Sequence, residues 1–309
     1  MLNQKLTYKI KQKGEYYQKL NSMERFSIII PCYNEEKTIE QTIEGLKKYL
    51  SINSLDAEII VINDASVDKS FNILKEIEGI KTITHINNRG YGASLKDGAR
   101  NATNDWIMFF DADGQHKPEY ILDAINELKN KKCDMVIGKR VDHKNTIKRG
   151  LGKKILTTIA QYLVEQKIPD INSGFRIMRK NDLLRYENIL PNSFSLSTTS
   201  TMAFLKDGLK IGYIPITINE REKASASTVK TKHGFQSVLL ILRVIMIFNP
   251  LKIFFPISIF LLAAGTLFSL YGIFVYGRFP SAGVIIIVTG ILTFFNGLLA
   301  DQISNIKRG

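Results

Sequence analysis

Cysteine is scarce in this sequence, because the 309 residues include only Cys32 and Cys133, which lie far apart and outside any metal-binding spacing. A disulfide framework is therefore excluded, and a reducing compartment is expected. The chain has neither a GxGxxG fingerprint nor a P-loop, so a dinucleotide dehydrogenase and an ordinary ATPase are not supported. Internal repeats and low-complexity tracts are also absent, which excludes a fibrous repeat protein.

Long uncharged runs are few, but two of them lie at the C-terminal end, at 253–277 and 279–300 with Arg278 between them. A membrane span needs roughly 20 apolar residues. These runs predict a two-helix transmembrane hairpin within 251–309, with spans at about 253–276 and 282–303. A purely soluble protein is excluded, and so is a polytopic transporter, which needs more spans.

Acidic residues are fewer than basic ones: the sequence contains 29 Asp and Glu and 42 Lys and Arg, for a net charge of +13. Because the apolar runs already bring the chain to a lipid bilayer, we expect an anionic membrane face rather than nucleic acid as the partner. The turn between the spans holds one cation, Arg278, whereas Arg243, Lys252, Lys307 and Arg308 flank the other ends. The positive-inside rule then predicts that both termini and the preceding domain are cytoplasmic.

Residues 1–25 lack the apolar core of a signal peptide and form a basic extension, which either rests on lipid headgroups or is a solvated tail. Residues 233–250 are predicted to form an amphipathic helix in the membrane interface.

Self-association of the hairpin is also open, because small residues allow helices to approach closely. Those residues are Gly265, Gly272, Gly290 and Gly297.

The remaining region alternates short apolar runs with helical patterns. Strands are expected at 26–31, 57–62, 81–86, 106–110, 134–138 and 211–216, and 172–176 is expected to be a loop entering a strand. Helices are expected from Asn34, as cap, to Leu50, and at 68–77, 90–102, 118–130, 148–166 and 197–208. This alternation predicts a mostly parallel α/β sheet covered on both faces.

Polar side chains cluster directly after three of the predicted strands, where ligands bind in such sheets. Asp111 and Asp113 follow the fourth strand at i and i+2 and can share one Mg²⁺ or Mn²⁺, with the oxygen of Gln115 as a further ligand. The alternative is an acidic turn without metal. His116, in the same loop, is expected to be a packing residue rather than a ligand.

Two further loops carry candidate functions. Asp64 ends the second strand, where it either meets a ribose or base edge or caps the next helix with Ser66 and Asp68. Residues 88–92 (NRGYG) precede a helix and can bring backbone close to a ligand.

Five segments together resemble the family 2 glycosyltransferases of the GT-A fold, over about 26–232. They are 28–36 (IIIPCYNEE), 63–68 (NDASVD), 88–93 (NRGYGA), 111–116 (DADGQH) and 170–176 (DINSGFR). The last segment is similar to that of dolichol-phosphate mannose synthases and related polyprenyl-phosphate glycosyltransferases. The resemblance implies a nucleotide-diphospho-sugar transferase domain with a mixed, mostly parallel sheet.

The resemblance also implies roles for single residues. The positions that match nucleotide-sugar contacts are Pro31, Tyr33, Glu35, Ile62, Asp64, Asp111, Ala112, Asp113 and Gln115, of which Asp111, Asp113 and Gln115 match the metal site. The candidates for the acceptor phosphate are Arg140, Arg176, Arg221 and Lys230, and catalysis is implied for Asp113, Arg140 and Arg221. The segment 221–230 departs from the family pattern, since its glycine is missing and its lysine is displaced, and Ala65 stands where glycine is usual.

These features predict an inverting transferase that moves a sugar from a nucleotide sugar to a polyprenyl or dolichyl phosphate. The element 173–176 favours mannose from GDP-mannose, and glucose or N-acetylhexosamine from a UDP-sugar stays open. A processive polysaccharide synthase is less favoured, because its acceptor motif contains a tryptophan and the only one here, Trp106, lies inside a predicted strand. A membrane scaffold without catalysis is the remaining alternative, and intact Asp111, Asp113 and Gln115 oppose it.

Overall fold

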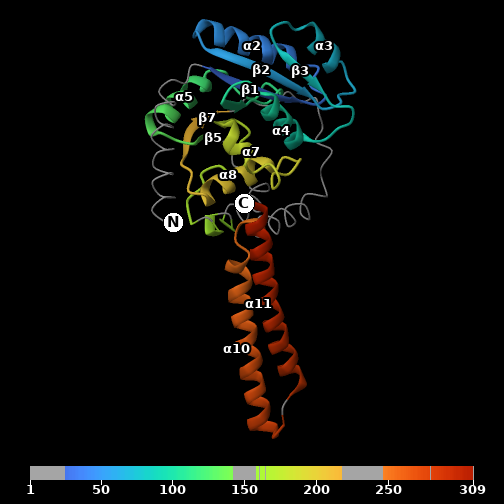
Figure 1. Cartoon of the computed structure of the whole chain (residues 1–309), viewed down its shortest axis with the longest axis vertical. Helices are drawn as coiled ribbons and strands as arrows, with labels where there is room; N and C mark the ends of the chain where they lie inside the picture. Colours follow the sequence, from blue (N-terminus) through green and yellow to red (C-terminus); the bar gives the residue numbers. More distant parts are fainter. Residues whose placement is uncertain are drawn as a thin grey trace. The chain divides into compact units, whose positions relative to one another are not determined.

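The computed structural model describes residues 25–141, 158–159, 161–163, 165–217, 246–278 and 280–308. The described residues fall into two compact units (Figure 1). One contains 25–141 and 168–217, and the other contains the described parts of 158–167 together with 246–308. The predicted basic extension, most of the predicted helix at 148–166, and residues 233–245 of the predicted interfacial helix lie outside the described residues.

The first unit is built on a seven-stranded sheet in the order β3-β2-β1-β4-β6-β5-β7. Its strands are β1 (Arg25–Cys32), β2 (Asp56–Asn63), β3 (Lys81–Thr84), β4 (Trp106–Phe109), β5 (Met135–Arg140), β6 (Arg176–Arg179) and β7 (Ile211–Ile216). Only β6 runs antiparallel to its two neighbours, β4 and β5, among the pairings of the described strands. The predicted mixed, mostly parallel sheet is confirmed.

Helices cover both faces of this sheet, as predicted. They are α2 (Ile39–Ile52), α3 (Ser70–Glu76), α4 (Tyr91–Asn101), α5 (Tyr120–Lys131), α7 (Lys180–Leu184) and α8 (Leu196–Lys206). Successive side chains of a strand point to opposite faces. Ile28 accordingly joins the core cluster that includes Leu46 of α2 and Leu128 of α5, whereas Ile29 packs against Gly98 of α4.

The first helix begins later than predicted, at Ile39 rather than directly after Asn34. Asn34 has a positive φ of 57°, and its side-chain oxygen accepts a hydrogen bond from the Val67 amide (2.9 Å). The Asn34 amide in turn donates to Ser66 Oγ (3.0 Å). The residue that was expected to cap α2 therefore joins the loops after β1 and β2, because its hydrogen-bond partners lie in the loop after β2.

The chain changes direction across the sheet between β1 and β4. From β1 the sheet grows through β2 to β3, and β4 then pairs on the opposite side of β1. In open α/β sheets, ligands bind beyond the carboxyl ends of the strands at such a switch point. The loops after β1 and β4, which carry Tyr33 and Asp111, meet at this position.

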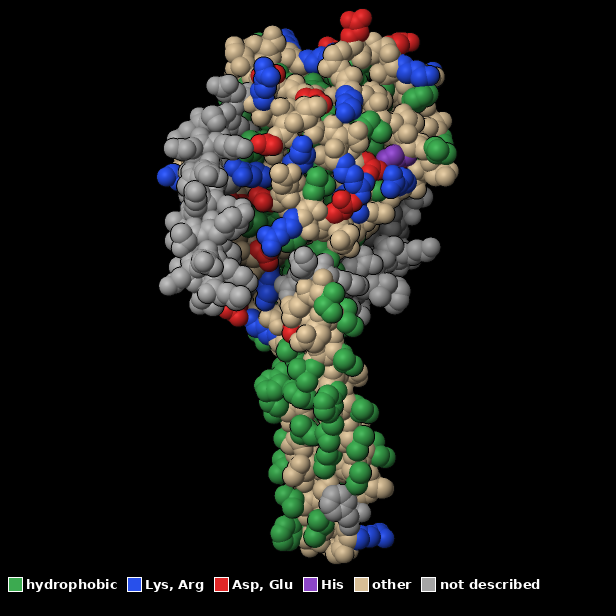
Figure 2. All heavy atoms as spheres, viewed as in Figure 1, with side chains coloured by type: hydrophobic (Ala, Val, Ile, Leu, Met, Phe, Trp, Pro, Cys, Tyr) green, Lys and Arg blue, Asp and Glu red, His purple; other side chains and the backbone are tan. Residues whose placement is uncertain are grey.

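The second unit is dominated by α10 (Leu251–Tyr276) and α11 (Ser281–Arg308), which run side by side (Figure 1). Both helices are long and apolar enough to cross a membrane, with a mean hydropathy of 2.2 each. Large apolar side chains such as Phe260 and Phe274 lie exposed on the hairpin surface, and Figure 2 shows hydrophobic side chains along its length.

The hairpin glycines lie between its own two helices. A Cβ added at Gly265 would lie 2.9 Å from the backbone nitrogen of Ile287, and one at Gly297 would lie 2.6 Å from Cβ of Phe254. Gly290 likewise packs on Leu262, and Gly272 packs on Pro280. The four glycines considered for self-association therefore pack within one chain. Self-association of the hairpin stays a prediction, but these contacts do not support it.

Candidate active site

The loop after β4 holds two carboxylates in a tight turn at the switch point. The Gln115 amide donates to Asp113 Oδ1 (3.1 Å), and Thr42 Oγ1 donates to the buried Ala112 carbonyl (3.2 Å). Gly114 has a φ of 70°, a conformation that favours glycine. These hydrogen bonds fix the backbone of the loop that carries Asp111 and Asp113.

The Asp111 carboxylate is oriented by two residues from other segments. Tyr91 Oη donates a hydrogen bond to Asp111 Oδ1 (2.8 Å). On the other side lies Gly174, where an added Cβ would come within 2.6 Å of Asp111 Oδ2. The Asp111 side chain remains 27% exposed, so the carboxylate is accessible to a ligand.

His116 packs beneath this loop. Its ring is buried and makes edge contacts with the rings of Phe110 and Phe175. Its Nδ1 accepts a hydrogen bond from the Asp111 amide (3.1 Å), which places the ring hydrogen on Nε2. Nε2 lies 3.6 Å from Asp111 Oδ2, which is too long for a hydrogen bond. This arrangement agrees with the packing role expected for His116.

The loop fits a divalent cation that is shared with a phosphate ligand. No group of three His, Cys, Asp or Glu side chains within the described ranges is placed to hold a metal ion. Asp111, Asp113 and the oxygen of Gln115 offer hard oxygen ligands, and the Asp111 side chain is partly exposed. Mg²⁺ is commonly held by one or two carboxylates together with substrate phosphates. The donor set therefore suits a cation that needs a diphosphate to complete its coordination.

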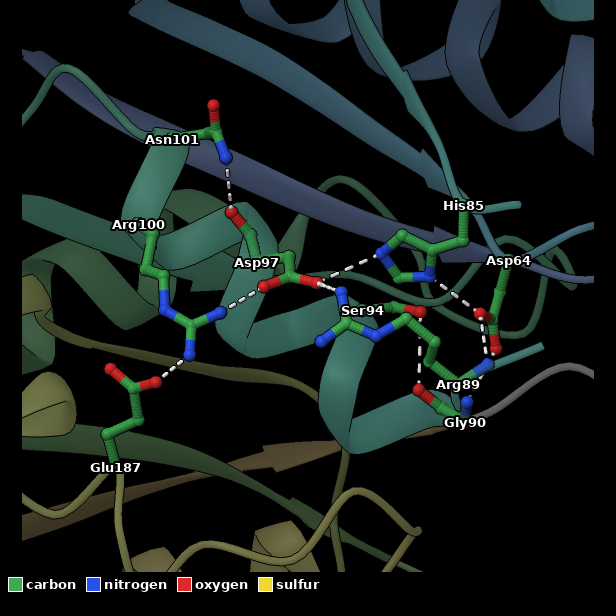
Figure 3. A network of polar contacts seen from close by, with 9 residues as sticks. All are labelled: Asp64, His85, Arg89, Gly90, Ser94, Asp97, Arg100, Asn101 and Glu187. Atoms are coloured by element: carbon green, nitrogen blue, oxygen red, sulfur yellow. Dashed lines mark hydrogen bonds and ion pairs between the residues drawn. The ribbon is translucent and has the colours of Figure 1, made fainter. Parts of the chain in front are cut away.

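Asp64, at the end of β2, is buried and belongs to a network of polar contacts (Figure 3). Its carboxylate accepts hydrogen bonds from the amides of Arg89 and Gly90 (2.8 Å each) and contacts His85 Nδ1 (2.7 Å). His85 Nε2 lies 3.0 Å from Asp97 Oδ2, which also accepts a bond from Arg89 Nη1. Asp64 thus orders the loop before α4 and does not cap the helix after β2, where Asp68 bonds the Ser70 amide instead.

The glycine-containing loop 88–92 was expected to offer its backbone to a ligand. In the structure its amides already have protein partners, because Gly90 donates to Asp64 and Gly92 donates to the Asn192 carbonyl (2.9 Å). An added Cβ at Gly92 would lie 2.3 Å from the Pro191 carbonyl oxygen. The close approach that this glycine permits is therefore to another loop of the same chain.

The remaining nucleotide candidates lie at the ends of β1 and β2, where Pro31 is paired with Ile62. Tyr33 is 47% exposed, whereas Ile62 is fully buried in β2 between β1 and β3 and is not placed to meet a ligand as the sequence suggested. Glu35 is tied into the adjoining turn, where its amide donates to Ser70 Oγ (2.9 Å) and its carboxylate accepts from Thr38 Oγ1 (3.2 Å).

Arg140, at the end of β5, makes a two-point ion pair with Asp170. Its Nε and Nη2 donate to the two Asp170 oxygens, at 2.8 and 3.0 Å. The Asp170 side chain is almost fully buried, and that of Arg140 is 29% exposed. A planar guanidinium held in this way keeps one direction, so Asp170 fixes the orientation of a partly accessible cation.

Arg176 lies inside the domain and not at its surface. Its guanidinium donates to the carbonyls of Ser173 and Ser197 and to hydroxyls of α8, at Ser200 (2.9 Å) and Thr201 (3.3 Å). Burial lowers the pKa of Arg176 to about 10, which leaves it cationic at neutral pH. Because the side chain is fully buried, Arg176 joins β6 to α8 and is not placed to meet an acceptor phosphate.

Arg221 and Lys230 lie outside the described residues. Three residues that do shape the site were not singled out from the sequence, namely Tyr91, Asp170 and Gly174. Two of them lie in the segment 170–176 and one in 88–93, both of which were recognised as motifs. Their roles depend on contacts with Asp111 and Arg140, which are far away along the chain.

Residues 27–186 match the family described as glycosyl transferase family 2, which is just over half of the chain. This chain belongs to glycosyl transferase family 2. Residues 249–306 of the glycosyltransferase match the GtrB C-terminal hairpin, which agrees with membrane association through α10 and α11.

Two archaeal relatives of this glycosyltransferase align over most of its length. The uncharacterized protein MJ1222 of Methanocaldococcus jannaschii is 29% identical over 77% of this chain and 97% of the relative. A UDP-N-acetylglucosamine–dolichyl-phosphate N-acetylglucosaminyltransferase of Methanococcus voltae is 28% identical over 71% of this chain and 95% of the relative.

Among solved structures, glucosyl-3-phosphoglycerate synthase of Mycobacterium tuberculosis, in complex with Mn²⁺, UDP-glucose and phosphoglyceric acid, has a TM-score of 0.57. It is 16% identical and covers 74% of this chain and 81% of its own. At this identity the likeness shows the fold alone, and it confirms the predicted GT-A architecture of the family 2 glycosyltransferase.

Proposed function

We propose that this glycosyltransferase transfers a sugar from a nucleotide sugar to the phosphate of a polyprenyl phosphate at a membrane surface. The observation that carries this proposal is the union, in one chain, of a family 2 transferase domain and an apolar GtrB-type hairpin. A lipid-phosphate acceptor accounts for both parts, since its tail stays in the bilayer and its phosphate stays in water. The relative from Methanococcus voltae is named for a reaction of this kind.

The donor is proposed to lie across the carboxyl ends of β1, β2 and β4. The nucleoside would be held near the exposed Tyr33, and the diphosphate near Asp111, Asp113 and Gln115. A bound Mg²⁺ or Mn²⁺ would neutralise the charge that develops on the departing nucleoside diphosphate. The protein contributes the fixed carboxylates of the loop 111–115, which set where that charge is stabilised.

The acceptor phosphate needs cations more than it needs a base. A phosphate monoester has a second pKa of about 6 and is largely dianionic near neutral pH. Arg140 is proposed to attract it, oriented by Asp170. Arg221 and Lys230 stay as further candidates from the sequence.

In the proposed reaction, an oxygen of the acceptor phosphate attacks the anomeric carbon of the donor sugar. A new carbon–oxygen bond forms while the bond to the diphosphate breaks, and the nucleoside diphosphate leaves with the electron pair. A single attack from the face opposite the leaving group inverts the anomeric centre.

The relative from Methanococcus voltae favours UDP-N-acetylglucosamine as donor. GDP-mannose was favoured from the element 173–176, but Arg176 of that element is buried against α8 and offers no group to a sugar. We therefore propose UDP-N-acetylglucosamine first and keep GDP-mannose and UDP-glucose as competing donors.

The test is a donor screen with membranes that contain the protein. Each radiolabelled nucleotide sugar is incubated with polyprenyl phosphate and Mg²⁺ or Mn²⁺, and the lipid product is identified by mass spectrometry. A labelled lipid phosphate sugar from one donor is expected. No labelled lipid from any donor would contradict the proposal, and metal-dependent nucleotide binding without turnover would favour the scaffold alternative.

A cytoplasmic location of the transferase domain and of both termini is also proposed, from the charges that flank the hairpin. A reporter fused to the C-terminus, active only in the cytoplasm, is expected to be active. Activity of a reporter inserted beside Arg278 instead would reverse the orientation.

A further inference from the structure

Three consecutive residues before and within α4 connect the two halves of the proposed donor site. The amides of Arg89 and Gly90 donate to Asp64, at the end of β2. The next residue, Tyr91, donates its hydroxyl to Asp111, after β4. The segment 89–91 therefore joins the nucleoside side of the site to the diphosphate side through three hydrogen bonds of 2.8 Å each.

Tyr91 is held on several sides. The residues before and after it are fixed by hydrogen bonds of their amides, Gly90 to Asp64 and Gly92 to the Asn192 carbonyl. Its ring stacks on Phe194, with centroids 4.7 Å apart and planes 21° from parallel. Its hydroxyl lies next to Gly174, where an added Cβ would come within 3.1 Å. The phenol is thus a fixed donor aimed at Asp111.

A carboxylate offers two oxygens with about four acceptor positions. A donor fixed on Oδ1 sets the rotation of the Asp111 carboxylate, and this side chain is 27% exposed and can still meet a further ligand.

We propose that Tyr91 is a positioning residue that sets the Asp111 carboxylate for a divalent cation bound together with a nucleoside diphosphate. The inference rests on the proposed function and adds a residue to it. Groups that orient metal ligands typically change metal affinity or activity by about 10- to 100-fold when they are removed.

The experiment compares Tyr91→Phe with a matched control. Tyr186→Phe also removes one tyrosine–aspartate hydrogen bond, from Tyr186 Oη to Asp207 Oδ2 (2.6 Å), but this bond does not involve the loop 111–115. Mn²⁺ is titrated into the full-length purified protein in the presence of UDP, with GDP in a parallel series, and bound Mn²⁺ is measured by electron paramagnetic resonance. Binding of each nucleotide is also measured with EDTA present.

For Tyr91→Phe we expect the half-saturating Mn²⁺ concentration to rise about tenfold. Nucleotide binding in EDTA and the Mn²⁺ titration of Tyr186→Phe are expected to match the wild type. An unchanged Mn²⁺ titration for Tyr91→Phe would overturn the inference. Equal weakening with and without EDTA would also overturn it, because the hydroxyl would then act on the fold in general.

Two further measurements cover the cases in which the wild type binds no Mn²⁺ or Tyr91→Phe does not fold. If the wild type takes up no Mn²⁺ with either nucleotide, the proposed donor site itself is wrong and the role of Tyr91 falls with it. If Tyr91→Phe does not fold, Phe194→Ala removes the stacking partner instead, and Phe194 is 78% exposed. That variant is expected to weaken Mn²⁺ binding in the same direction by a smaller factor, and wild-type binding would refute the proposal.

Discussion

In the transferase domain, Gly174 faces the carboxylate of Asp111, whereas in the hairpin, Gly265 faces the backbone of the neighbouring helix at Ile287. Both positions lack a side chain so that another group can approach. In the domain the approaching group is charged and partly accessible, and its position can serve binding. In the hairpin the approaching group is a helix backbone, and the gain is packing alone.

The two units also differ in where their buried polar groups find hydrogen-bond partners. In the domain they bond across long sequence distances, as Arg176 does with Ser200 of α8. In the hairpin, Ser258, Ser269, Thr289 and Thr293 bond to carbonyls of their own helix, as Ser269 Oγ does with the Gly265 carbonyl (2.8 Å). Ser304, near the end of α11, instead bonds to the Ile247 carbonyl. An apolar surrounding offers no water as a partner, so a helix there has to satisfy its own polar groups. The site chemistry is therefore concentrated in the first unit.

Asp113→Asn is expected to have the largest effect, and it tests whether the chemistry of the site lies in the transferase domain. The change removes one charge from the proposed cation site, and turnover is expected to fall about 100- to 1,000-fold, as when a transition-state charge loses one stabilising group. Formation of lipid-linked sugar measures it. Asp123→Asn, an exposed position in the first turn of α5, is the control and is expected to keep full activity. Full activity of Asp113→Asn would remove the metal hypothesis.

Gly174→Ala tests the close approach in the domain. The new Cβ would lie 2.6 Å from Asp111 Oδ2, so the carboxylate has to turn away. We expect turnover to fall about 10- to 100-fold, as for the loss of a group that orients a metal ligand. Assays at rising Mn²⁺ concentration measure this effect. Wild-type turnover at all concentrations would show that the position of Asp111 is not critical.

Gly265→Val tests the close approach in the hairpin. The added side chain meets Ile287 and is expected to destabilise the helix pair by about 1–3 kcal/mol. Thermal unfolding in detergent measures the change, and UDP binding with Mn²⁺ is expected to stay at the wild-type level. Gly45→Ala, on α2 with open space around it, is the control and is expected to stabilise by about 0.5–1 kcal/mol. Loss of UDP binding in Gly265→Val would contradict the separation of roles.

Glu58→Gln tests a polar cluster that serves stability alone, and its effect is the smallest. Burial tends to raise the pKa of Glu58, but hydrogen bonds from Thr103 and Ser27 outweigh it and hold the pKa below its usual 4.5. A lowered folded pKa contributes stability above pH 4.5 that is lost as the pH falls through the folded pKa. The difference in unfolding free energy between wild type and variant should therefore shrink below pH 4.5. Denaturant titrations between pH 3 and 7, approximately the range of carboxylate titration, measure it. A constant difference over that range would be inconsistent with this pKa.

The fold was largely predictable because most strands and helices carry a clear local pattern. The apolar run at 26–31 and the uncharged run at 253–277 decide their own structure locally, through burial and through length. The order of the strands was not predictable in this way. β6 enters between β4 and β5 in the antiparallel direction, and this follows from pairing between residues far apart in sequence.

The site shows the same limit. Asp111 and Asp113 could be proposed as site residues because their spacing within one loop is visible along the chain. Asn34 and Arg176 were assigned differently from where they lie, since their partners, Val67 and the hydroxyls of α8, come from other segments.

Local sequence patterns are enough to predict that a mostly parallel α/β domain is joined to an apolar hairpin and that two aspartates follow a buried strand. These features depend on periodicity, length and neighbouring residues, which a linear chain displays. The packed chain was needed to find which groups orient Asp111, that Arg176 lies buried, and that Gly265, Gly290 and Gly297 face the neighbouring helix of the hairpin. Those outcomes depend on contacts between distant segments, and such contacts form only when the whole chain has packed.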